Sequence, residues 1–136
     1  MQGALDPPVN VTAWMALNDV DEENGCVKIL PGTHRAAVEH RDTGSSAFQG
    51  GLREEAAIGP EVLATAVPIP LHPGEFFLFN ENTIHGSDAN GSNRPRYGLA
   101  IRVCPASVKV NIKKAGYAPV LLRGSGGEGV LRPEQL

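Results

Sequence analysis

The sequence has little of what would tie it to a disulfide framework, a membrane or a nucleic acid. Its 136 residues include only two cysteines, Cys26 and Cys104, and both lie in apolar stretches that suit buried free thiols. No apolar run reaches transmembrane length, and no signal peptide is recognisable. A net charge of −3 offers no basic excess for nucleic acid or anionic membranes. We therefore expect a cytoplasmic protein that acts on a small molecule, with no nucleic-acid or membrane partner.

Glycine and proline are abundant instead. Sixteen glycines and 11 prolines suit many short strands joined by tight turns better than they suit a helical bundle. The length is enough for one core. The sequence predicts a single all-β domain with a long loop and little helix.

Apolar patterns predict where the strands lie, by alternation at 9–17 and 96–105 and by a continuous apolar run at 75–80. The expected strands are residues 9–17, 26–30, 75–80, 83–87 and 96–105. Asn24-Gly25 predicts a chain reversal, and Pro68 and Pro70 restrict 62–71 to an extended, edge-like segment. The polar stretch 35–59 predicts a long loop or lid with a short helix at 52–57.

The last of these strands has an unusual face. Arg96 shares it with Gly98 and Ala100, whose small side chains leave volume beside the arginine. Arg96 could therefore reach a ligand instead of packing, and the alternation favours Arg96 over Arg94 for this role.

One of the four histidines stands out. His85 follows the most hydrophobic strand and precedes two small residues that let a ligand come close. His34 and His40 lie in loop-like sequence and His72 precedes a Pro-Gly turn, so we expect these three on the surface.

Four blocks of sequence, in order, resemble one known family. The segment from His85 to Arg96 is His-Gly-Ser-Asp-Ala-Asn-Gly-Ser-Asn-Arg-Pro-Arg, and it resembles the distal-histidine and arginine segment of the phytanoyl-CoA dioxygenase family. The blocks at 11–17, at 23–34 and at 73–75 resemble the same family. The resemblance covers about residues 5–105, and the order and spacing of the blocks make it specific.

The resemblance implies a double-stranded β-helix, the jelly-roll or cupin-like fold. This fold holds Fe(II) by two histidines and one carboxylate and leaves room for 2-oxoglutarate and molecular oxygen. By position, His85 resembles the second iron-binding histidine. Ser87 and Arg96 resemble the groups that hold the distal carboxylate of 2-oxoglutarate, and Trp14 resembles an aromatic that lines the cosubstrate pocket. The implied activity is that of an Fe(II)/2-oxoglutarate-dependent oxygenase that hydroxylates a small organic substrate.

The sequence departs from the family at the first half of the iron site. The family carries a His-x-Asp pair a little over a dozen residues before the position of Trp14, and the 13 residues before Trp14 contain no histidine. Asp6 lies in a Leu-Asp-Pro-Pro stretch that resembles the loop after the pair. We therefore expect a fragment that starts downstream of the pair. Residues 1–112 would be the C-terminal part of an incomplete double-stranded β-helix with exposed sheet edges, and 113–136 a peripheral tail.

Other functions stay open. A non-catalytic jelly-roll module could bind 2-oxoglutarate or another carboxylate through Arg96 without a metal. A related halogenase would replace the carboxylate ligand by glycine or alanine, and Gln2-Gly3 allows that comparison although Met1 then stands where the histidine belongs. A cupin-like metal isomerase is disfavoured because no His-x-His followed by glutamate occurs. The substrate-selecting loops carry no readable signature.

Overall fold

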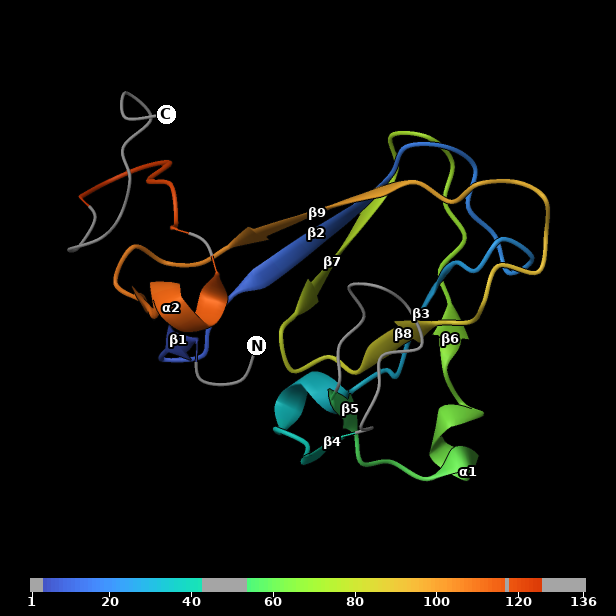
Figure 1. The fold of residues 1–136 in the computed structure, drawn as a ribbon, viewed down its shortest axis with the longest axis horizontal. Coiled ribbons are helices and arrows are strands. Elements are labelled where there is room, and N and C mark those ends of the chain that lie inside the picture. Colours follow the sequence, from blue (N-terminus) through green and yellow to red (C-terminus); the bar gives the residue numbers. More distant parts are fainter. Residues whose placement is uncertain (1–3, 43–53, 117, 126–136) are drawn as a thin grey trace. The chain divides into compact units, whose positions relative to one another are not determined.

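Short strands make up most of the regular secondary structure in the described chain (Figure 1). The structure is a computed structural model that describes residues 4–42, 54–116 and 118–125. Its helices are limited to two short α-helices and one 3-10 turn within those ranges. None of the described helices has the length and apolar character needed to cross a bilayer. The prediction of an all-β fold is confirmed.

One three-stranded sheet holds the strands that the apolar patterns predicted most clearly. It consists of β2 (Val11–Ala16), β7 (Phe76–Asn80) and β9 (Gly98–Val103) in the order β7-β2-β9. Each strand is shorter than its predicted range, and single backbone bonds continue some of the pairing beyond the strand ends. The Leu17 amide, for example, donates to the Tyr97 carbonyl over 3.1 Å, beyond the end of both strands.

A second three-stranded sheet carries the histidine strand. It consists of β3 (Val27–Ile29), β6 (Val67–Pro68) and β8 (His85–Ser87) in the order β6-β3-β8. Both pairings are antiparallel, and Ile29 faces His85 in the register. Within the described ranges β8 and β9 each have one neighbouring strand, so each presents an edge.

The remaining elements are small. β1 (Leu5–Asp6) pairs with β10 (Lys109–Val110), and β4 (His40–Asp42) pairs with β5 (Glu54–Ala56). The 3-10 turn is Thr33–Arg35, and the helices are α1 (Pro60–Leu63) and α2 (Ile112–Ala115).

Two local predictions were wrong. The expected helix at 52–57 is contradicted at Glu54–Ala56, which form β5, while 52 and 53 lie outside the described residues. Pairing with β4 overrides the helix propensity of Glu54-Glu55-Ala56. The segment 62–71 is also not wholly extended, because its first two residues complete α1, which begins at Pro60.

The chain divides into two compact units, and β2, β7 and β9 each contribute residues to both. The core of the unit formed by 14–77 and 82–99 is Ala16, Val20 and Cys26, with Trp14 and Leu71 packed against it. An isolated bridge joins Val20 to Leu71. Cys26 is a buried free thiol as expected, and burial raises its pKa.

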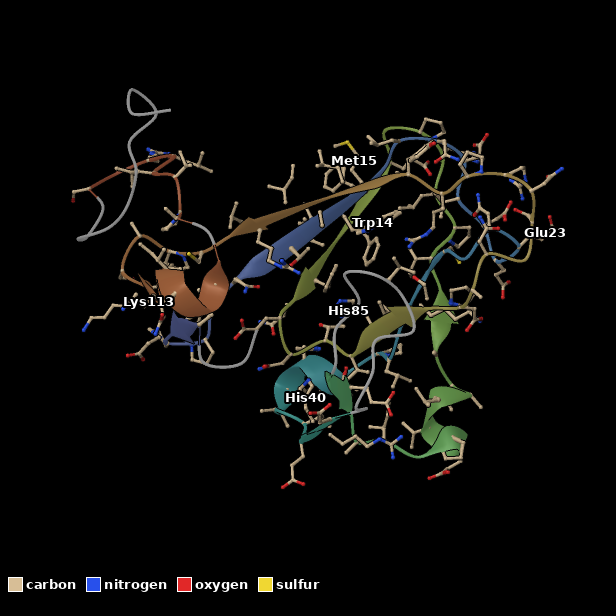
Figure 2. All side chains as sticks on the ribbon, viewed as in Figure 1. Trp14, Met15, Glu23, His40, His85 and Lys113 are labelled. Carbon is tan, nitrogen blue, oxygen red and sulfur yellow. The ribbon has the colours of Figure 1, made fainter. Side chains whose placement is uncertain are left out.

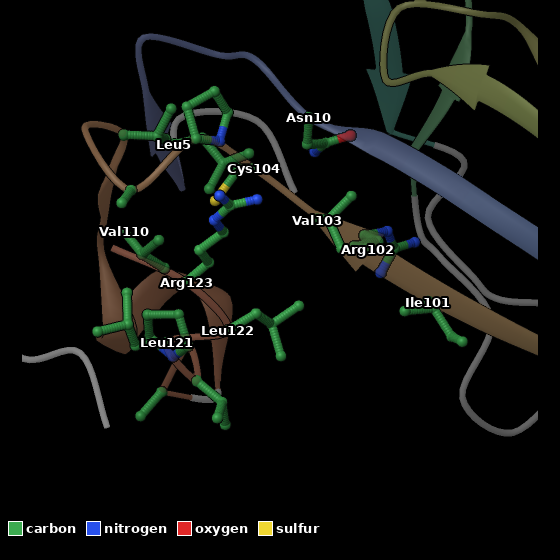
Figure 3. A pocket seen from close by; sticks show the side chains of 16 residues that line it. Leu5, Asn10, Ile101, Arg102, Val103, Cys104, Val110, Leu121, Leu122 and Arg123 are labelled. Atoms are coloured by element: carbon green, nitrogen blue, oxygen red, sulfur yellow. The ribbon is translucent and has the colours of Figure 1, made fainter. Parts of the chain in front are cut away.

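The other unit has a polar contact in its interior. Asn10 is buried, and its Nδ2 donates to Oε2 of Glu81 over 2.9 Å. Burial raises the pKa of Glu81. A largely apolar cavity of about 600 Å³ lies in this unit (Figure 3), and it is lined by residues that include Leu5, Ile101 and Val110. None of the residues predicted to bind iron or 2-oxoglutarate lines it.

The apolar face predicted for the last strand remains at the surface. Tyr97, just before β9, and Leu99, Ile101 and Val103 within it are all exposed. Two of these side chains, Ile101 and Val103, also line the apolar cavity.

Candidate functional site

All four predicted site residues lie in the unit formed by 14–77 and 82–99. Trp14 belongs to β2, His85 and Ser87 belong to β8, and Arg96 lies two residues before β9. Figure 2 shows Trp14 and His85 on strands of the two different three-stranded sheets. His85 and Ser87 are two residues apart in one strand, so their side chains leave the same face of β8.

Trp14 and Arg96 are in direct contact. The Cζ atom of Arg96 lies 5.7 Å from the centroid of the Trp14 ring, within the range of a cation–π interaction. On β7 the Phe77 ring packs against the same indole, with the centroids 6.2 Å apart and the planes at 41°. The guanidinium of Arg96 therefore rests on an aromatic surface while the residue stays exposed.

Gly98 makes room for this contact. A Cβ atom at Gly98 would overlap the six-membered ring of Trp14. The sequence predicted empty volume beside Arg96 on this face, and the structure fills the volume at Gly98 with the indole. The missing side chain at Gly98 thus lets the Trp14 ring lie where it contacts Arg96.

We expect Gly98→Ala to displace the Trp14 ring. Overpacking of this kind costs about 1–3 kcal/mol of unfolding free energy. The chain has a single tryptophan, so its fluorescence reports on this ring alone. A change in emission maximum together with a lower denaturant midpoint is the expected result. Gly86→Ala is the control, because a Cβ there has no neighbour within 4 Å among the described residues. Equal effects of the two substitutions would contradict the placement of the indole.

One ring nitrogen of His85 is held by the backbone. Its Nδ1 is 2.8 Å from the carbonyl oxygen of Thr83. A carbonyl oxygen only accepts, so Nδ1 donates its proton and Nε2 carries the lone pair that a metal ligand needs. This backbone contact is the usual way in which the second nitrogen of a metal-binding histidine is held.

The metal donor set is incomplete in the described ranges. No group of three His, Cys, Asp or Glu side chains that could hold a metal ion occurs there. The other three histidines are exposed, as expected, and His85 is exposed as well. His72 is 2.9 Å from Oδ1 of Asp19, and this hydrogen bond raises the histidine pKa. His85 thus fits an iron site as one ligand, and the described residues do not complete it.

Sequence reasoning missed the polar side chains that hold the segment before β9. Asn18 contacts the backbone on both sides of Arg96, and the fully buried Asn24 donates to the Pro95 carbonyl over 3.4 Å. Arg94 donates through Nη2 to both carboxylate oxygens of Asp21, at 3.0 and 2.7 Å. Arg94 lowers the pKa of Asp21, and the carboxylate in turn raises the pKa of Arg94. The only sequence signal was the acidic turn at 18–25, which indicated a chain reversal and no partner.

The sequence matches the model of one known protein family over most of its length. Residues 3–98 match the sequence model of the family described as Phytanoyl-CoA dioxygenase (PhyH). The chain belongs to the phytanoyl-CoA dioxygenase family. It is 30% identical over 97 residues to the bovine phytanoyl-CoA dioxygenase domain-containing protein 1, a match that covers 69% of this chain and 33% of the relative. The chain spans about one-third or less of the length of the curated relatives it matches.

Solved structures agree with the family. The apo form of the non-heme monooxygenase ThoJ has a TM-score of 0.69 at 24% identity, over 95% of this chain and 45% of that one, and shows the shared fold. The epimerase SnoN, solved with Fe³⁺, alpha ketoglutarate and nogalamycin RO, has a TM-score of 0.57 at 25% identity. That match covers 90% of this chain and 45% of SnoN. The predicted double-stranded β-helix is confirmed, and Fe(II) and 2-oxoglutarate are the cofactors of this oxygenase family.

Proposed function

We propose that this phytanoyl-CoA dioxygenase family chain is the C-terminal part of an Fe(II)/2-oxoglutarate-dependent oxygenase that hydroxylates a small organic substrate. The contact between Arg96 and Trp14 is the observation that carries the proposal. It presents a guanidinium, held on an aromatic face, to a ligand carboxylate. Planar guanidinium groups bind carboxylates through two parallel hydrogen bonds, as the distal carboxylate of 2-oxoglutarate requires.

Each proposed site residue has one task. Arg96 binds the distal carboxylate, Ser87 adds a hydroxyl hydrogen bond, and Trp14 packs against the carbon chain of the cosubstrate. His85 offers Nε2 as one iron ligand, because its Nδ1 is committed to the Thr83 carbonyl. Bound Fe(II) would supply the activation of molecular oxygen, and the further ligands would come from a His-x-Asp pair that precedes Met1 in the complete protein.

The test is the nucleotide sequence upstream of Met1, followed by expression of the extended protein. We expect a His-x-Asp pair shortly upstream and succinate formation from 2-oxoglutarate that requires both Fe(II) and oxygen. His85→Ala in the extended protein should remove succinate formation and Fe(II) binding together. A complete upstream region without such a pair would overturn the proposal. A His-x-Gly or His-x-Ala sequence there would point to halogenation instead of hydroxylation.

A second candidate follows from the incomplete donor set. The described residues present an arginine anchor for a carboxylate but no group of three metal-binding side chains. A non-catalytic module would bind 2-oxoglutarate, or another carboxylate, without metal. Calorimetry with and without Fe(II) separates the candidates, since an isolated imidazole does not make a transition-metal site. Binding that needs Arg96 and is unaffected by metal in the extended protein would favour the module.

A further inference from the structure

The side-chain amide of Asn18 binds the backbone on both sides of Arg96. Its Nδ2 donates to the carbonyl oxygen of Pro95 over 2.7 Å, and its Oδ1 accepts the amide N–H of Tyr97 over 2.8 Å. Both distances lie within the usual range of N–H···O hydrogen bonds. The two bonds bracket a single residue, Arg96.

These contacts extend the pairing of β2 with β9. The last backbone bond between the two segments runs from the Leu17 amide to the Tyr97 carbonyl over 3.1 Å. At the next position the side chain of Asn18 replaces the backbone as partner and takes up the Tyr97 amide. The segment that carries Arg96 is thereby fixed before the strand itself begins at Gly98.

Asn24 also binds the backbone next to Arg96 and the turn that carries Asn18. Asn24 is fully buried, and its Nδ2 donates to the Asp19 carbonyl over 2.9 Å and to the Pro95 carbonyl over 3.4 Å. Its Oδ1 accepts the Asp21 amide over 2.9 Å. The turn that holds Asn18 is therefore itself fixed, and the Pro95 carbonyl receives donors from two asparagines.

We propose that Asn18 is a positioning residue for the carboxylate anchor: it holds the backbone around Arg96 so that the guanidinium lies over Trp14. This inference rests on the proposed function, and it adds a residue that contacts neither cosubstrate nor metal. An arginine side chain has several rotatable bonds, so a fixed starting point for its backbone limits where the guanidinium can go.

The effect of losing Asn18 is expected to depend on the distal carboxylate of the ligand. Loss of Asn18 should weaken the binding of a 2-oxo acid only if that acid carries the distal carboxylate. 2-Oxoglutarate has this group, and 2-oxovalerate has the same carbon chain without it. A residue that merely stabilises the fold would change the binding of both acids in equal proportion.

The test combines two readouts. The first is the fluorescence of Trp14 in the 136-residue chain without ligand, since indole emission responds to a charge beside the ring and this chain has a single tryptophan. The second is titration of the extended protein with 2-oxoglutarate and 2-oxovalerate in the presence of Mn(II), a redox-stable substitute for Fe(II). The variants are Asn18→Ala, Asn18→Asp and Arg96→Ala. Asn93→Ala is the control, an exposed asparagine in the same segment for which no hydrogen bond is found among the described residues.

We expect Asn18→Ala to shift the Trp14 emission in the same direction as Arg96→Ala. It should reduce the preference for 2-oxoglutarate over 2-oxovalerate by about tenfold, the effect of two lost hydrogen bonds of ordinary strength. Asn18→Asp keeps the acceptor for Tyr97 and loses the donor for Pro95, so its preference should fall between those of Asn18→Ala and the parent chain. Asn93→Ala should match the parent chain.

Failure of the Asn18 inference can be told apart from failure of the proposed function. If Arg96→Ala removes the preference and Asn18→Ala leaves both the preference and the emission unchanged, the positioning role is overturned and the proposed function stands. If Asn18→Ala lowers the thermal midpoint but not the preference, its role is structural and the inference is again overturned. If Arg96→Ala itself leaves the preference unchanged, the proposed function fails and the inference fails with it.

Discussion

Replacing Arg96 with alanine is expected to weaken 2-oxoglutarate binding by roughly a hundredfold, the effect of removing one partner of a hydrogen-bonded charge pair. The guanidinium makes two charge-assisted bonds with a carboxylate, and alanine leaves that carboxylate without a counter-charge. The contact with Trp14 adds to the effect because it presents the guanidinium in one place, 5.7 Å from the ring. Titration calorimetry with the extended protein measures the affinity directly.

Two further variants show whether the effect belongs to this arginine. Arg96→Lys keeps the charge but cannot bind a carboxylate through two parallel bonds, so it should recover only part of the affinity. Arg102→Ala removes an exposed arginine from β9 that shares the predicted face of Arg96 and should leave the affinity unchanged. Equal losses in Arg96→Ala and Arg102→Ala would indicate a general electrostatic effect and would contradict the anchor.

Much of the fold could be predicted because its main strands have clear apolar patterns. Alternation placed β2 and β9, a continuous apolar run placed β7, and Pro73-Gly74 marked the turn before β7. The positive φ of 83° at Gly25 likewise agrees with the turn predicted from Asn24-Gly25. These features depend on neighbours in sequence, so local pattern is enough to find them.

The contacts that place Arg96 could not be predicted in the same way. Asn18 and Tyr97 are 79 positions apart, and Arg94 and Asp21 are 73 positions apart. The residues of the acidic turn at 18–25 do not indicate which distant segment they will bind. For the same reason the pairing of β5 with β4 was missed, since Glu54–Ala56 has ordinary helix-forming residues and becomes a strand only through its partner.

The distinction matters for His85 as well. Its sequence context and the resemblance to the family selected it, and the structure adds the Nδ1 contact with the Thr83 carbonyl, which leaves Nε2 as the nitrogen for the proposed iron site. Its place in β8 opposite Ile29 follows from strand pairing across more than fifty positions. The metal role of His85 stays a prediction, and the local contact with Thr83 indicates which of its nitrogens would bind.

Gly25→Ala is expected to lower the unfolding free energy by about 2–4 kcal/mol, because it combines a left-handed backbone with an overlap. Gly25 has a φ of 83°, a conformation that residues with a Cβ atom adopt at a cost. A Cβ there would also lie 2.8 Å from the carbonyl oxygen of Asp88, closer than such atoms approach. Urea unfolding followed by Trp14 fluorescence gives the midpoint.

Gly32→Ala separates the two causes. Gly32 has a φ of 84°, but a Cβ there has no neighbour within 4 Å among the described residues, so only the backbone cost of about 1–2 kcal/mol applies. The excess loss in Gly25→Ala then measures the close approach of the acidic turn to the segment that leads from Asp88 to Arg96. Because this approach holds the anchor segment, Gly25→Ala should also weaken 2-oxoglutarate binding, whereas Gly32→Ala should not. Equal losses of stability in the two variants would contradict the close approach of Gly25 to the Asp88 carbonyl.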